Sequence, residues 1–187
     1  MMLCVFHFFQ SFGYYGFGTL AALVLVSRGY TVTSSLLFSA LSYLGYPIGS
    51  VLAIPLLKRF ERKLLVMGTV AAVAVFGLLF ATVANSAAIV VSGFLTTATS
   101  NVFSNVYHVY QAEIFPTDVR ATAVGLAYSL SRLSSGMLPF ILIPVLDNYG
   151  AAAMFTVVLV ALAITITVIG LIGPRTTGRN LEEINPV

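Results

Sequence analysis

The feature that most constrains this chain is a succession of six apolar segments joined by short polar links. About 20 apolar residues are enough to cross the hydrocarbon core of a bilayer as a helix. Charged residues make up only 8% of the chain, whereas a soluble domain carries about 25%. The sequence therefore predicts an all-α, multi-pass membrane protein. The expected transmembrane helices are approximately 3–26, 32–57, 64–84, 87–112, 119–146 and 151–172, followed by a polar tail, 173–187.

Basic residues predict the orientation of these helices. Cytoplasmic loops carry an excess of Lys and Arg. If both termini lie on one side, the other side carries only Arg28, and the first side carries the set Lys58, Arg59, Arg62, Lys63, Arg120, Arg175 and Arg179. We therefore expect a protein of the plasma membrane with both termini, and the tail, in the cytoplasm.

Composition also excludes several classes of function. The net charge of +3 follows from this topology and does not indicate nucleic-acid binding. The chain has one cysteine, Cys4, and its histidines, His7 and His108, lie in different predicted helices, so we expect no metal site and no cofactor. The sequence has no carboxylate pair or phosphate-binding loop typical of an enzyme.

Polar side chains are distributed unevenly among the predicted helices. Segments 64–84 and 151–172 have only threonines, which can satisfy their hydroxyl groups on their own helix, so these two can face lipid. The other four segments carry Asn, Gln, His, Tyr or Arg and should line an interior. The order inner, inner, outer occurs twice, which predicts two successive three-helix inverted repeats.

Three motifs resemble those of the major facilitator superfamily of transporters. Residues Glu113–Gly125 (EIFPTDVRATAVG) resemble the link between helices ten and eleven of that family, and the loop Lys58–Lys63 is similar to its repeated basic loop. The tail 173–184 (GPRTTGRNLEEI) resembles the ending of the branch that holds sugar porters, organic-acid permeases of the niacin and aromatic-acid type, and synaptic-vesicle-2-like proteins. Arg175 stands where that branch has Glu. The resemblance implies that residues 1–187 are the C-terminal six-helix half of such a transporter. Its partner would be an N-terminal six-helix half from the same gene or from another.

Arg132 is the candidate residue for binding an anionic substrate. It lies within an apolar segment and has no acidic residue within ten positions. A charge in hydrocarbon costs from about 2.5 to more than about 10 kcal/mol, so such residues usually face a protein interior or a watery cavity. The planar guanidinium matches a carboxylate, although a structural ion pair, or a side chain that reaches to the membrane interface, is the alternative. The other candidate substrate-binding residues are Tyr128, Gln10, Tyr14, Asn101 and Asn105.

A second group of charged residues is a candidate for gating. Glu113 and Arg120 flank Pro116, and opposite charges at a helix junction can pair in one state of a transporter and separate in the other. The resemblance implies that both also engage Arg59 and Arg62. The alternative is a static ion pair.

The expected function is transport of a small organic anion by alternating access, and the resemblance implies proton coupling. His108 is a candidate proton relay, although simple solvation is the alternative. Two other functions remain open: transport of a sugar or other neutral metabolite, and a non-transporting truncated half or a module that depends on a partner.

Overall fold

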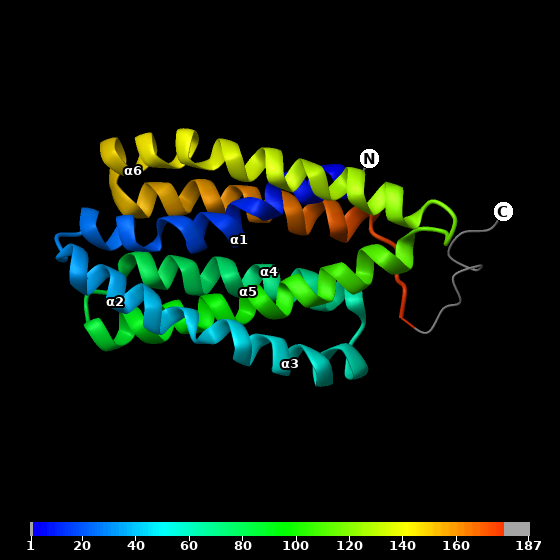
Figure 1. The fold of residues 1–187 in the computed structure, drawn as a ribbon, viewed down its shortest axis with the longest axis horizontal. Helices are drawn as coiled ribbons and strands as arrows, with labels where there is room; N and C mark the ends of the chain where they lie inside the picture. Colours follow the sequence, from blue (N-terminus) through cyan, green and yellow to red (C-terminus); the bar gives the residue numbers. More distant parts are fainter. Residues whose placement is uncertain (1, 178–187) are drawn as a thin grey trace.

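The computed structural model describes residues 2–177, and this part of the chain is helical throughout apart from short links. Its elements are α1 (Met2–Ser27), α2 (Val32–Tyr43), α3 (Gly45–Arg59), α4 (Arg62–Thr82), α5 (Ser86–Ile114) and α6 (Arg120–Ile172). Five segments are long and apolar enough to cross a membrane: α1, α2 with α3, α4, α5 and α6. All of them run along the long axis of the molecule (Figure 1). The prediction of an all-helical, multi-pass membrane protein is confirmed.

The predicted helices 119–146 and 151–172 are joined more tightly than expected. The predicted link 147–150 is helical almost to its end, and α6 departs from helical geometry only at Gly150, with φ 80° and ψ 177°. The left-handed φ suits glycine, which has no Cβ to clash with the backbone. The chain turns back there (Figure 1). Leu142 and Val158 lie on either side of this turn, and both face Gly16 of α1: a Cβ there would be 3.5 Å from Leu142 Cδ1 and 3.8 Å from Val158 Cγ2. Thus α6 consists of two arms that pack against the same helix.

The predicted helix 32–57 is interrupted. α2 ends at Tyr43 and α3 begins at Gly45, with Leu44 between them. Pro47 has no N–H to donate to the carbonyl of Tyr43, four residues before it, so the regular hydrogen-bond pattern stops there. Pro55 lies inside α3 without ending it.

Side chains fix several helix ends. Thr31, Glu61 and Asn85 are the N-caps of α2, α4 and α5, and each accepts a hydrogen bond from a backbone N–H of the first turn. Arg28 donates to the carbonyl oxygens of Phe80 (3.0 Å) and Val83 at the C-terminal end of α4. A cation is favoured there by the helix dipole. Arg28, the basic residue predicted on the less basic side of the membrane, therefore has a structural role at the end of α4.

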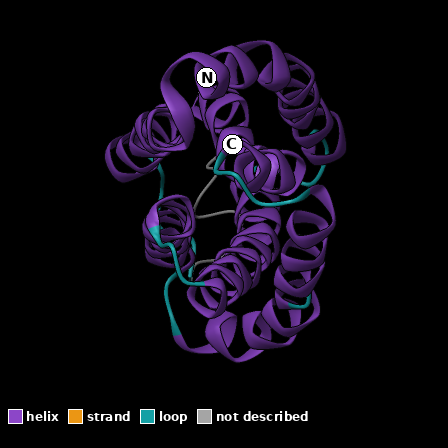
Figure 2. Ribbon diagram, turned by 90° about the vertical axis from the view of Figure 1, so that its left-hand side faces the viewer, coloured by secondary structure: helices purple, strands orange, loops and turns teal. Residues whose placement is uncertain are grey.

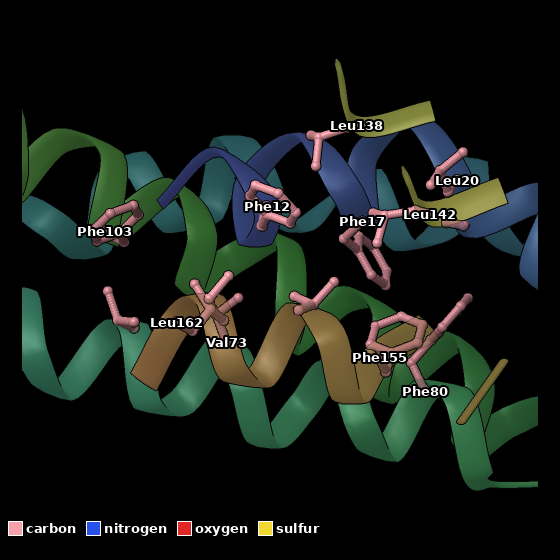
Figure 3. Close-up of a cluster of buried hydrophobic side chains, with 14 of the residues drawn as sticks. Phe12, Phe17, Leu20, Val73, Phe80, Phe103, Leu138, Leu142, Phe155 and Leu162 are labelled. Carbon is pink, nitrogen blue, oxygen red and sulfur yellow. The ribbon is translucent and has the colours of Figure 1, made fainter. Parts of the chain in front are cut away.

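The helices form two groups around an apolar core. α1 packs with α6, and α5 packs with α2, α3 and α4, while α4 also contacts α6 (Figures 1 and 2). Figure 3 shows Phe17 of α1, Phe80 of α4 and Phe155 of α6 converging where the groups meet. The rings of Phe17 and Phe80 lie 4.9 Å apart in an edge-to-face arrangement. Apolar side chains thus fill the region where the two groups meet, although some polar side chains, such as His7 and Gln10 of α1, are also buried.

α3 and α5 touch through their backbones. A Cβ atom at Gly45 would meet the carbonyl oxygen of Phe94, and one at Gly49 would meet that of Ala98. Small residues four apart allow such close approach between membrane helices.

Gly49→Ala is therefore expected to destabilise the protein, because neither backbone can move without the rest of its helix. Overpacking of this kind costs about 1–3 kcal/mol. Gly68→Ala on α4 is the matched control, because a Cβ there would have no atom within 4 Å. Thermal unfolding of the detergent-solubilised variants measures the difference. Equal melting temperatures for the two variants would contradict the backbone contact.

Candidate functional site

Arg132 lies on the first arm of α6, where it is exposed and held between two tyrosines. Its Nη2 donates to the hydroxyl of Tyr128, one turn earlier, at 2.9 Å. The guanidinium carbon lies 5.1 Å from the centre of the Tyr128 ring and 5.5 Å from that of Tyr15 on α1. Cation–π contacts of this kind stabilise a cation by about 0.5–2 kcal/mol. The predicted pair of Arg132 and Tyr128 is thus in contact, and Tyr15 completes the group.

No carboxylate neutralises Arg132 within residues 2–177. The ion pair in this part of the chain joins Arg62, at the start of α4, to Glu113, at the end of α5, and does not include Arg132. The two tyrosine contacts leave guanidinium N–H groups of Arg132 free. Since a guanidinium presents its donors in a planar fork, the free edge is suited to a planar anion such as a carboxylate.

Further aromatic side chains continue this surface toward α3. The ring of Tyr14 lies 5.1 Å from that of Tyr15 and 6.4 Å from that of Tyr46 on α3. Tyr43 lies 5.8 Å from Tyr46 and donates its hydroxyl to the carbonyl oxygen of Gly18 at 2.7 Å. Tyr14, a predicted substrate-binding residue, therefore belongs to a row of half-buried tyrosines that begins beside Arg132.

The predicted amides do not join this group. Asn105 donates to the side-chain oxygen of Asn101 at 2.8 Å, and the same oxygen accepts from Ser50 of α3 at 2.7 Å. Asn101 and Asn105 therefore link α5 to α3. Gln10 is 2% exposed, and its Oε1 has no hydrogen-bond partner within the described residues. That oxygen remains an available acceptor inside the helix bundle.

A hydrogen-bonded chain of three side chains lies beside Tyr128. His7 Nε2 is 2.8 Å from Gln111 Oε1, and Gln111 Nε2 is 2.9 Å from His108 Nδ1. The centres of the His7 and His108 rings lie 5.7 Å and 5.8 Å from that of Tyr128. His108 and Gln111 are three positions apart on α5, so helical periodicity brings them together. No local pattern signals the contact with His7, which is 104 positions away from Gln111.

The candidate gating residues lie at the end of the molecule where α3, α5 and the described tail end (Figure 1). Arg62 Nε and Glu113 Oε1 form an ion pair at 3.2 Å. The two side chains are partly buried, with exposed fractions of 22% and 26%. Arg120 instead donates its Nε to the carbonyl oxygen of Phe115 at 3.3 Å. Residues 115–119 form a turn, which brings Arg120 back over the end of α5. Arg59 is exposed at the last position of α3.

The first residues of the tail are attached to the same end. Arg62 donates its backbone N–H to Thr177 Oγ1 at 3.1 Å, and Tyr110 donates its hydroxyl to the carbonyl oxygen of Pro174 at 2.8 Å. Lys63 donates to the carbonyl oxygens of Gly170 and Gly173 at 2.9 and 2.8 Å. Arg62 thus connects α4 with both α5 and the tail. The predicted tail residues from 178 on, including Arg179, lie outside the described residues.

Sequence comparisons agree with these features. The family model described as "Major Facilitator Superfamily" matches residues 3–185. YyaJ of Bacillus subtilis (strain 168), which is named for metabolite transport, is 34% identical over 127 residues, 68% of this chain and 28% of that protein. The niacin transporter NiaP of Acinetobacter baylyi (strain ATCC 33305 / BD413 / ADP1) is 29% identical over 98% of this chain and 42% of that protein. The minor myo-inositol transporter IolF of Bacillus subtilis (strain 168) is 33% identical over 42% of this chain and 18% of that protein.

The chain thus spans less than half the length of these relatives. The match to the family covers nearly all of the chain, and it agrees with the motifs around Glu113 and in the tail. The chain belongs to the major facilitator superfamily of membrane transporters and not to an enzyme family.

Proposed function

We propose that this chain is the C-terminal half of a transporter that carries a small organic anion, such as an aromatic monocarboxylate, by alternating access. The observation that carries the proposal is Arg132, an exposed guanidinium held between Tyr15 and Tyr128 with no carboxylate partner in residues 2–177. A substrate carboxylate would bind to the free edge of the guanidinium. An aromatic ring attached to it would lie against the tyrosines, where offset or edge-to-face contacts contribute about 0.5–1.5 kcal/mol each.

The proposed architecture has six membrane crossings arranged as two inverted three-helix repeats. It counts the two arms of α6 as separate crossings, with Gly150 as their link. The end of the molecule that holds Arg62, Lys63 and Arg120 would face the cytoplasm, as would both termini, because basic residues are enriched on that side. The membrane would be the plasma membrane, and the relative YdjE of Escherichia coli (strain K12), named as an inner membrane protein, supports this placement.

The site would be completed by an N-terminal six-helix half. In transporters of this kind, the substrate lies near the membrane midplane between two halves. Arg132 is 12 positions from Arg120, at the start of α6, which corresponds to about 18 Å along a helix at 1.5 Å per residue. Arg132 would therefore lie near the middle of a hydrocarbon core of about 30 Å.

A neutral polyol is the second candidate substrate. Asn101, Asn105 and Ser50 form a polar cluster of the kind that binds hydroxyl groups, and IolF is named as a myo-inositol transporter. These side chains already bond to one another, whereas Arg132 has donors to spare. The anion is therefore the better supported of the two.

Ligand-induced stabilisation tests the proposal directly. A ligand that binds the folded state raises its stability by about 2.7 kcal/mol at 100 times its dissociation constant. We expect nicotinate and benzoate to raise the melting temperature of the purified natural gene product. Nicotinamide, which has nearly the shape of nicotinate without its charge, should have little effect. Equal stabilisation by nicotinamide and nicotinate would contradict the proposal. So would stabilisation by myo-inositol but not by either acid.

A further inference from the structure

The chain of His7, Gln111 and His108, here called the His–Gln–His unit, connects α1 with α5 beside the candidate site. His7 is fully buried, with 0% of its surface exposed, whereas His108 is exposed. The Nδ1 atom of His7 has no hydrogen-bond partner within the described residues. The unit therefore has one end on the surface of the described chain and one end enclosed within it.

The amide of Gln111 controls which protonation states the unit can adopt. A primary amide has one accepting end and one donating end. When Oε1 faces His7, Nε2 of His7 must carry a proton, and Nδ1 of His108 must not, because it accepts from the amide. When the amide is turned over, the roles of the two rings are exchanged. In either orientation the two facing ring nitrogens have opposite protonation states, so both imidazoles cannot be charged without losing a hydrogen bond.

The surroundings of the unit add no other acid or base of similar strength. The titratable groups that face it are Tyr107 of α5 and Tyr128 of α6, whose rings lie 5.6 and 5.7 Å from His7 and 4.2 and 5.8 Å from His108. The charged group next to them is Arg132, which is bonded to the Tyr128 hydroxyl. Within residues 2–177, no carboxylate lies against either imidazole ring. A proton on the unit would thus be a new positive charge separated from Arg132 by one tyrosine ring.

The unit also lies on the path between the candidate site and the end with the Arg62–Glu113 ion pair. His108 is six residues before the end of α5, about 9 Å along the helix, and Glu113 lies in the last turn. Tyr128 is one helical turn before Arg132 on α6. A proton that enters at His108 from this end would therefore arrive beside the anion-binding residue.

We infer that the His–Gln–His unit is a binding site for a single proton that is carried together with the anionic substrate. This inference rests on the proposed function. A proton binds to Nδ1 of His108, the amide of Gln111 turns so that its oxygen accepts from that N–H, and its NH₂ group then donates to Nε2 of His7. His7 keeps one ring proton: a transient opening of the helix packing around this buried ring lets water take the proton from Nε2 and return one to Nδ1. The loaded unit holds one proton more than the empty unit. A second added proton is excluded, because the amide of Gln111 cannot accept from both rings. The added charge stabilises a bound carboxylate near Arg132, and the proton returns to water on release.

Two transport measurements on the natural gene product in proteoliposomes test this inference, with radiolabelled nicotinate as the probe. Exchange of internal for external nicotinate at equal pH requires no net proton movement. Accumulation driven by a pH gradient requires it. We expect His7→Gln and His108→Gln to reduce gradient-driven accumulation at least tenfold, while exchange falls no more than threefold.

Gln111→Glu provides a second variant that keeps both histidines. A carboxylate accepts from both rings, so it stabilises the protonated unit, and an opposite charge at this distance shifts titration by about one pH unit or more. We expect the pH for half-maximal accumulation to rise by about one unit. Thr99→Ser, on α5 but outside the unit, is the control and should behave as wild type.

The outcomes separate the two proposals. If wild-type protein exchanges no nicotinate, the proposed function is wrong, and the inference is overturned with it. If it exchanges nicotinate and both histidine variants retain gradient-driven accumulation, the inference alone is overturned. An equal loss of exchange and accumulation in the variants would also overturn it, because a packing role affects both in the same way.

Discussion

Arg132→Lys is expected to reduce the rate of nicotinate uptake at low concentration at least tenfold, although lysine keeps the positive charge. The guanidinium contacts Tyr15, Tyr128 and, in our proposal, the substrate at the same time. An ammonium group is a compact charge with strong hydration, and it cannot present two parallel donors to a carboxylate while it also bonds to Tyr128. A tenfold loss corresponds to about 1.4 kcal/mol, close to the lower end of the range of about 1.5–3 kcal/mol for one hydrogen bond to a charged group. Initial rates over a range of nicotinate concentrations measure this loss.

Two comparisons make the result specific. Arg28→Lys changes the same residue type at the C-terminal end of α4, away from the Arg132 site, where the side chain caps that helix, and it should leave uptake unchanged. Tyr128→Phe removes the hydroxyl that accepts from Arg132 but keeps the ring, so a smaller loss than that of Arg132→Lys is expected. Wild-type uptake by Arg132→Lys would assign Arg132 a structural role.

Glu113→Gln is expected to reduce transport at least tenfold while the protein still reaches the membrane. Glu113 pairs with Arg62 across the ends of α5 and α4, and Arg62 also holds the tail through Thr177. If this ion pair forms in only one of the two states of alternating access, its loss changes the equilibrium between them. Uptake, corrected for the amount of protein at the cell surface, is the measurement.

An exchange of charges tests the ion pair itself. Glu113→Arg combined with Arg62→Glu should recover a substantial part of the transport lost in either single variant, because the attraction is restored with opposite polarity. Arg120→Gln removes a charge at the same end but breaks only a hydrogen bond to a carbonyl oxygen, so its effect should be smaller. Failure of the double variant to exceed the single variants would be evidence against a gating pair.

The positions of the helices could be predicted because long apolar runs, interrupted by charged or capping residues, depend only on local sequence. Helix α4 was expected at 64–84 and is found at Arg62–Thr82. The details depend on single residues. Asp147 and Asn148 suggested a polar link, but both remain helical. The chain reverses at Gly150, the residue of α6 that has a left-handed φ. The break at Leu44 likewise depends on the missing N–H of Pro47.

The candidate site was harder to predict because it depends on contacts between distant segments. Arg132 and Tyr128 are four residues apart on one helix, and helical periodicity places them together. No periodicity relates Tyr15 to Arg132, His7 to Gln111, or Arg62 to Glu113, since each pair is formed by the packing of separate helices. The same packing directs Asn101 and Asn105 toward Ser50 and not toward Arg132.

Counterflow in proteoliposomes tests the central claim most directly, because it requires binding and reorientation of the purified protein and nothing else. Vesicles loaded with unlabelled nicotinate should transiently accumulate external radiolabelled nicotinate. Vesicles loaded with nicotinamide or myo-inositol should not accumulate it, and Arg132→Lys should abolish the effect. Counterflow that is equally strong with internal nicotinamide, or that persists in Arg132→Lys, would contradict the assignment of Arg132 as the residue that binds the substrate anion.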